Sequence, residues 1–139
     1  MFVGIIFFSF INAYAADYIG DACWNFKRTD NTSGIIKIGI SHIGGAHFLC
    51  SGVITVTEPI NFQAPTFGNI ELINDEIHLT LSLTGLRNNQ IEVENINIGI
   101  DMIKAILNPN NLNGEYQSVG TYSGAFENSG GTLQFISCP

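Results

Sequence analysis

Two histidines, His42 and His47, flank a Gly44-Gly45 pair that is typical of a hairpin turn. If a loop of two or four residues joins the flanking strands, the two imidazoles stand opposite one another, close enough to share a metal ion. A zinc site needs three or four protein ligands, and no third ligand is evident for this pair. The pattern therefore favours two exposed histidines at a hairpin tip, and we expect neither a metal site nor a cofactor.

A second group that could do chemistry consists of three acidic residues, Glu92, Glu94 and Asp101. Paired carboxylates serve as acid and base in glycoside hydrolysis, and carboxylate oxygens also bind Ca²⁺. The residues do not follow the spacing of an EF-hand loop. A solvated strand face is the simpler explanation for them.

Nucleophilic catalysis has no stronger support. The chain contains no Gly-x-Ser-x-Gly motif, and the histidine nearest to Cys50 in sequence is His47. Residues an odd number of positions apart on one strand point to opposite faces of a sheet, which argues against a Cys–His pair. We therefore predict that the protein is not an enzyme.

Aromatic side chains are the remaining signal. The interior of an eight-stranded barrel is either filled by side chains or holds one small ligand, and the sequence leaves both interiors open. If a small apolar ligand binds there, the aromatic residues expected to contact it are Trp24, Phe26, Phe48, Phe62, Phe67, Tyr116 and Tyr122.

The chain has three cysteines, Cys23, Cys50 and Cys138. Cys23 and Cys138 lie near the two ends of the mature chain, and a disulfide between them would close a loop of about 115 residues. Cys50 falls within a predicted strand, where a buried and unreactive thiol is the usual outcome. We predict the Cys23–Cys138 bond, with Cys23–Cys50 as the pairing that would contradict it.

Residues 1–15 have the features of a secretion signal. An apolar run from Phe2 to Ile11 precedes Ala13-Tyr14-Ala15, which has the small-x-small form of a cleavage site. The run is shorter than the roughly 20 residues that span a bilayer, so an uncleaved anchor is the less favoured reading. We expect an exported protein, periplasmic or extracellular, whose residues 16–139 form one domain without a membrane span.

The net charge of −7 belongs to that domain, because the 5 basic and 12 acidic residues all follow residue 15. Such a surface repels phosphate backbones, which proteins bind through clustered Lys and Arg. We therefore expect no nucleic-acid partner.

Most of the chain alternates hydrophobic and polar residues, which predicts β-strands. Residues 102–107 fit a helix or a strand, and their Ile-rich neighbours favour a strand. Residues 57–68, which contain Pro59 and Pro65, are expected to form a long loop, and 128–131 a turn. The other expected strands are 23–28, 35–43, 46–56, 69–73, 76–84, 90–94, 112–119, 121–127 and 132–138.

Eight to ten short strands predict a single antiparallel up-and-down β-barrel, with a β-sandwich as the alternative. Several segments also resemble a group of small exported bacterial proteins, mostly uncharacterised. The matching segments are Cys23-Trp24, 46–52, Leu112-Asn113-Gly114 and the stretch 128–138, which includes Gly-Thr-Leu-x-Phe-x-x-Cys. The resemblance implies a calycin-like (lipocalin-like) barrel tied by its terminal cysteines, and it implies no catalytic residues.

The sequence therefore favours an exported, non-enzymatic barrel that binds a small apolar ligand in its interior. A protein-binding module, such as a hydrolase inhibitor that acts through loops or an acidic edge, is the alternative of a different class. A structural envelope protein is the third reading.

Overall fold

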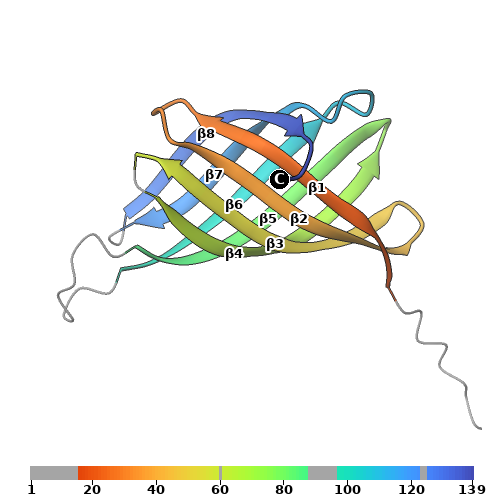
Figure 1. Ribbon diagram of the computed structural model, residues 1–139, viewed down its shortest axis with the longest axis horizontal. Coiled ribbons are helices and arrows are strands. Elements are labelled where there is room, and N and C mark those ends of the chain that lie inside the picture. Colours follow the sequence, from red (N-terminus) through yellow and green to blue (C-terminus); the bar gives the residue numbers. More distant parts are fainter. Residues whose placement is uncertain (1–15, 60, 88–96, 123–124) are drawn as a thin grey trace, which may run out of the picture.

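In a computed structural model, which describes residues 16–59, 61–87, 97–122 and 125–139, the chain forms one closed barrel of eight antiparallel strands (Figure 1). Each strand pairs with the next along the chain, and β8 pairs back with β1. The strands are β1 (Asp17–Arg28), β2 (Ser33–Gly44), β3 (His47–Glu58), β4 (Phe62–Ile73), β5 (Glu76–Arg87), β6 (Asn97–Leu107), β7 (Gly114–Tyr122) and β8 (Ala125–Ile136).

This architecture confirms the predicted all-β, calycin-like up-and-down barrel, and the β-sandwich alternative is wrong. Residues 102–107 belong to β6, so the strand interpretation of that segment is confirmed. Among the residues that the structure describes, none forms a helix with the length and hydropathy that a membrane crossing requires. The predicted signal sequence, residues 1–15, lies outside the described residues.

Side chains alternate between the interior and the outer face along each strand, as the geometry of a closed barrel requires. On β5, the odd-numbered leucines from Leu79 to Leu83 are buried, as their spacing predicts. The even-numbered faces of β2 and β3 also meet as expected, with Ile36 opposite Ile54. An irregularity between His42 and Gly44 keeps these faces in register.

The segment 57–68 is not the predicted long loop, because β4 begins at Phe62. Pro65 led to that error, since proline cannot donate to a strand ladder. In the structure Pro65 pairs with Val53 of β3, while the ladder between β4 and β5 starts one residue later, at Thr66. Proline is therefore tolerated where β4 has a partner on one side only.

The predicted turn at 128–131 is also wrong, because these residues lie inside β8. Gly131 pairs with Arg28 on one side and with Tyr116 on the other. A Cβ atom at Gly131 would meet the backbone carbonyl oxygen of Lys27. The glycine thus allows two strands to approach closely. In the sequence, such a glycine looks the same as a glycine in a turn.

Cys23 and Cys138 form a disulfide, which confirms the predicted pairing. The C-terminal tail turns back across β1 to reach Cys23 (Figure 1). Cys50 is a free, buried thiol on β3, and burial raises its pKa to about 11. Only the disulfide, then, adds covalent closure to the β1–β8 pairing.

Removing the disulfide with a Cys23→Ser/Cys138→Ser double substitution should lower the free energy of unfolding by about 4–5 kcal/mol, since the bond closes a long loop of the unfolded chain. Denaturant titration measures the loss. Non-reducing peptide mapping should link the two terminal peptides and leave Cys50 alkylatable only after unfolding. A link from Cys23 to Cys50 would overturn the assignment.

Several inward-facing glycines lie where neighbouring strands approach closely. At Gly52 an added Cβ would meet the backbone carbonyl oxygen of Lys37 and the Cα of Ile38. At the outward-facing Gly39, the nearest atoms would instead be side-chain atoms of Tyr18 and Asp21, at 3.3 and 3.4 Å. The first contact requires the backbone to shift, whereas the second requires only side-chain adjustment.

We therefore expect Gly52→Ala to destabilise the barrel by about 2–3 kcal/mol through overpacking. Gly39→Ala, the matched control, should change stability by less than about 1 kcal/mol. Alanine gives the unfolded chain less conformational freedom than glycine, and this gain offsets the mild side-chain contact. Urea denaturation of both variants tests the difference. Equal effects of the two substitutions would show that close strand approach at Gly52 does not constrain the fold.

Candidate functional site

The interior of the barrel brings together three of the aromatic residues that the sequence predicted for ligand contact. Trp24 and Phe26 of β1 and Tyr116 of β7 are all buried members of the hydrophobic core. Phe48 and Phe62 are partly buried and pack against the same core. These five rings therefore belong to, or pack against, one hydrophobic core.

The other two predicted residues do not add to this group. Phe67 faces the outside of the barrel with 61% of its surface exposed. It lies an odd number of residues from Phe62 on the same strand, so the two rings must point to opposite faces. The side chain of Tyr122 lies outside the part of the chain that the structure describes.

The loop between β6 and β7 contacts the interior next to Trp24. The indole Nε1 of Trp24 donates a hydrogen bond of 2.8 Å to the backbone oxygen of Leu112, in the loop between β6 and β7. The Trp24 ring also makes an edge contact with Phe135, at 5.7 Å between centroids. The backbone N–H of Phe135 in turn donates to the Oδ1 of Asn113 in the same loop. These contacts tie the β6–β7 loop to this part of the interior.

Four polar side chains form a second group, in which Arg28 ends β1 and Tyr116 lies two residues after the start of β7. We call Arg28, Tyr116, Ser118 and Ser129 the polar cluster. Arg28 stands opposite Gly131, and Gly131 stands opposite Tyr116, so no side chain separates the arginine from the tyrosine along this row. In the next row Ser118 and Ser129 share a hydrogen bond of 2.6 Å.

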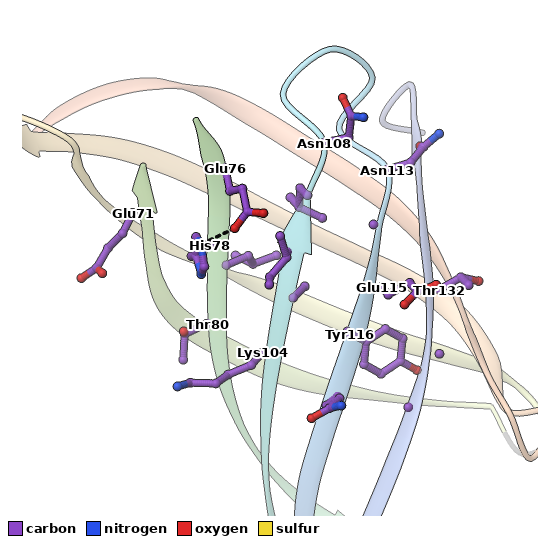
Figure 2. Close-up of a pocket in the computed structure, with 18 of the residues that line it drawn as sticks. Glu71, Glu76, His78, Thr80, Lys104, Asn108, Asn113, Glu115, Tyr116 and Thr132 are labelled. Atoms are coloured by element: carbon purple, nitrogen blue, oxygen red, sulfur yellow. Dashed lines mark hydrogen bonds and ion pairs between the residues drawn. The ribbon is translucent and has the colours of Figure 1, made fainter. Parts of the chain in front are cut away.

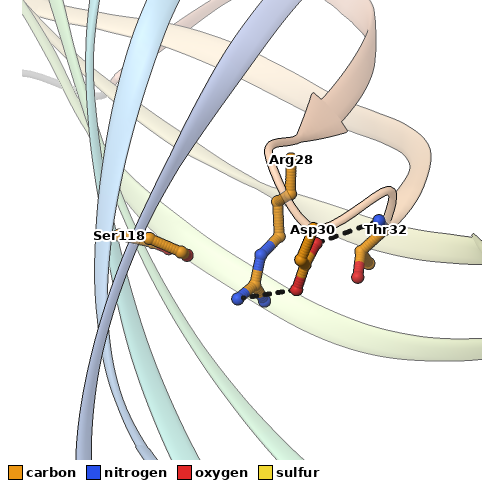
Figure 3. Close-up of polar contacts among 5 residues, drawn as sticks. Arg28, Asp30, Thr32 and Ser118 are labelled. Atoms are coloured by element: carbon orange, nitrogen blue, oxygen red, sulfur yellow. Dashed lines mark hydrogen bonds and ion pairs between the residues drawn. The ribbon is translucent and has the colours of Figure 1, made fainter.

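Arg28 extends from the end of β1 into the barrel, between Asp30 and Ser118 (Figure 3). Its side chain is 18% exposed, and one guanidinium nitrogen lies 3.3 Å from the carboxylate of Asp30, which is 52% exposed. The buried Nε of Arg28 has no hydrogen-bond partner among the described residues. The pairing thus engages one end of the guanidinium and leaves the Nε without an acceptor among the described residues.

The Asp30 carboxylate has a second role, in the β1–β2 turn. It accepts a hydrogen bond of 3.0 Å from the backbone N–H of Thr32 (Figure 3). This bond is the main cause that lowers the pKa of Asp30, and the charge of Arg28 lowers it further. The hydrogen bond in the turn therefore favours the ionised form of Asp30. An exposed ion pair such as that between Arg28 and Asp30 contributes at most about 1 kcal/mol to stability.

Tyr116 is the most deeply buried member of the polar cluster, at 4% exposure. Its hydroxyl is buried and has no hydrogen-bond partner within the described part of the chain. Burial raises the pKa of Tyr116 to about 12, while the charge of Arg28 lowers it and that of Asp30 raises it. Both charges act on the phenol, so Arg28 and Asp30 lie within electrostatic reach of Tyr116.

A groove of about 1170 Å³ crosses the outer face, over β4 to β8 (Figure 2). Its polar lining includes Glu76 and His78, whose side chains are 3.1 Å apart, together with Lys104 and Glu115. We call this surface the outer groove. It carries more acidic than basic side chains, and its lining also includes Tyr116 of the polar cluster and Gly131 from the same row.

The histidines and acidic residues do not assemble into a metal site where the structure describes them. His42 stands opposite Phe48 rather than His47, and His47 faces Glu71 at 3.7 Å. No group of three or more His, Cys, Asp or Glu side chains converges within the described residues. Asp101 lies half-buried in β6, whereas Glu92 and Glu94 lie outside the described residues. His47 is exposed and Cys50 buried, as their opposite strand positions predict.

Sequence reasoning missed the polar cluster, although part of its signal was present. Arg28 shares its strand parity with Trp24 and Phe26, and Ser118 shares its parity with Tyr116. Ser129 could not be found this way, because its stretch was assigned to a turn. A strict reading of parity to the last residue of β1 would have placed Arg28 inside.

Comparison with protein-family models, with curated proteins and with solved structures finds no match to this chain. The class of protein that the structure defines is a calycin-like eight-stranded barrel with buried polar side chains in its interior.

The unpaired hydroxyl of Tyr116 has a measurable consequence for stability. In ligand-free, refolded protein, Tyr116→Phe should leave the free energy of unfolding unchanged or raise it by about 1 kcal/mol, since it removes a buried polar group that lacks a partner. Chemical denaturation at pH 7 measures this. A loss of 1 kcal/mol or more would show that the hydroxyl is hydrogen-bonded in the free protein.

The same substitution predicts a pH dependence. Between pH 10 and 12 the unfolded state loses the Tyr116 proton while the folded state keeps it, so the stability of the unsubstituted protein falls as the pH rises through this window. Tyr116→Phe lacks this proton and should fall less steeply. Parallel slopes for the two proteins would contradict the raised pKa.

Proposed function

We propose that this protein is an exported, non-enzymatic β-barrel that binds a small, mainly apolar molecule in its interior. The observation that carries the proposal is the buried Tyr116 hydroxyl without a partner, beside an Arg28 Nε in the same condition. Buried polar groups in folded proteins nearly always have hydrogen-bond partners. A molecule bound inside the barrel supplies them.

The aromatic lining supports the same function. Trp24, Phe26 and Tyr116 offer apolar ring surface within a closed barrel, the architecture that holds one small ligand in other eight-stranded barrels. The β6–β7 loop accepts a hydrogen bond from Trp24. We place the entry of the ligand at the β1–β2 end, because Arg28 keeps part of its side chain exposed there.

The proposal also includes the location of the protein and its relationship to other exported barrels. The Cys23–Cys138 disulfide is compatible with an oxidising compartment, since such bonds persist mainly in exported proteins. Together with the apolar run before residue 15, it supports a periplasmic or extracellular location. The shared segments around Cys23-Trp24 and 128–138 support membership of the small exported bacterial barrels that the chain resembles.

Blocking the interior tests the proposal. Ser118→Phe places a ring among the polar cluster, whereas Gln117→Phe places the same ring on the outer face one residue away. With the neutral fluorescent probe phenylnaphthylamine, we expect binding to the unsubstituted protein and to Gln117→Phe, and at least about tenfold weaker binding to Ser118→Phe, because the ring occupies the site. Circular dichroism and thermal unfolding check that both variants fold.

Equal binding of the probe by the two variants would place the site outside the interior and contradict the proposal. The same holds if the refolded, unsubstituted protein binds no apolar probe.

The outer groove supports a second candidate, a protein-binding module such as a hydrolase inhibitor. Ile106 is half exposed among the acidic side chains of the groove, a combination that suits a partner with basic and apolar groups. Stoichiometric inhibition of a lytic enzyme, lost in Ile106→Lys, would favour this function. Inhibition unaffected by that substitution would exclude the groove as the contact surface.

A further inference from the structure

Hydrogen-bond donors converge at the polar cluster, with few acceptors to match them. A guanidinium carries five N–H donors and no acceptor; that of Arg28 forms an ion pair with Asp30, and its Nε has no partner among the described residues. The Tyr116 hydroxyl adds a further donor without a partner. Because Ser118 and Ser129 share one hydrogen bond, one of their two hydroxyl hydrogens remains available. The missing groups at this site are acceptors.

The register of β1, β8 and β7 explains why these donors can reach the same group of a bound ligand. Gly131 lies between Arg28 and Tyr116 in their row, and it contributes no side chain to the space between them. Ser129 is two residues from Gly131 on the same inward face, and Ser118 is opposite it. The four side chains thus share one inward face of β1, β8 and β7, and the backbone of Lys27 and Arg28 fills the position next to Gly131.

The charge balance selects the kind of acceptor. Arg28 brings one positive charge, and the half-exposed Asp30 offsets part of it. A single negative charge can be matched here, because guanidinium groups bind carboxylates through two parallel hydrogen bonds. A doubly charged phosphate monoester would leave an excess negative charge beside Asp30, which is costly in a partly buried site.

We propose that the interior ligand is a carboxylic acid with an apolar body, whose carboxylate is bound by Arg28 and Tyr116. This inference rests on the proposed interior site and adds its ligand class. Arg28 ends β1 and Trp24 lies four residues earlier, so about 13 Å of strand separates the two positions. The carboxylate lies toward the β1–β2 turn, and the apolar body extends past Phe26 toward the Trp24 ring.

Matched acid and alcohol ligands test this orientation and class. Dodecanoate and dodecanol share the apolar chain and differ in the head group, and each is measured by displacement of phenylnaphthylamine. We expect the protein to bind dodecanoate at least about tenfold more tightly than dodecanol. Arg28→Gln should abolish this preference by weakening dodecanoate about tenfold or more while leaving dodecanol unchanged, because the charge-assisted hydrogen bonds are lost.

Two further variants separate the site from general charge and folding effects. Lys27→Gln removes the same charge from the adjacent, outward-facing position and should leave both affinities unchanged. Tyr116→Phe should weaken dodecanoate about threefold to tenfold without loss of stability, and it should not alter dodecanol binding. Dodecyl phosphate should bind more weakly than dodecanoate.

The outcomes distinguish this inference from the function on which it depends. If the probe and both ligands fail to bind, the interior site itself is wrong. If dodecanoate and dodecanol bind equally, or if Arg28→Gln and Lys27→Gln weaken dodecanoate equally, the acid inference is wrong while the interior site stands. If dodecyl phosphate binds most tightly, the head group is a phosphate rather than a carboxylate.

Discussion

The pairing of β1 with β8 is the constraint on which the rest of the molecule depends. Six residue pairs, from Cys23↔Ile136 to Arg28↔Gly131, convert a sheet of eight strands into a barrel without free edges. The Cys23–Cys138 bond reinforces the same pairing. Without this seam, Arg28 on β1 and Tyr116 on β7 would lie on opposite sides of an open sheet, six strands apart. With it, one glycine separates them, so the fold's closure and the candidate site have a single origin.

The interior that results is uneven in polarity along the axis of the barrel. At Trp24 the polar group is satisfied within the protein, because the indole N–H donates a hydrogen bond to the backbone oxygen of Leu112. The Trp24 ring also packs on Phe135. The Nε of Arg28 and the hydroxyl of Tyr116 are not satisfied by the described residues. A buried hydroxyl without a partner costs about 1–3 kcal/mol, so a protein optimised for stability alone would carry phenylalanine at 116. This unsatisfied hydroxyl lies near a partly buried cation, and that combination supports a binding role.

Much of the architecture could be predicted from local pattern. Alternation on β5, the meeting of the even faces of β2 and β3, and the pairing of Cys23 with Cys138 all followed from spacing along the chain. Prediction failed where a barrel uses turn-forming residues inside strands. Pro65 lies beyond the end of one ladder, and Gly131 accommodates a close strand, yet both resemble loop residues in the sequence.

That confusion also hid the site. With 128–131 taken as a turn, Ser129 had no strand on which to face Ser118, and the row from Arg28 to Tyr116 could not be drawn. Phe67 was assigned to the interior for the same reason, because a loop at 57–68 imposes no parity on its rings. The polar cluster depends on register between β1, β8 and β7, and register between distant segments is information that residue types alone do not contain.

The central claim is that a molecule other than water completes the polar cluster. A high-resolution crystal structure of the protein purified from its own source, without refolding, tests this most directly. We predict density inside the barrel for an organic acid whose oxygen atoms contact the Tyr116 hydroxyl and the Arg28 guanidinium. Ordered water alone at both groups, with side chains filling the remaining interior, would contradict the account.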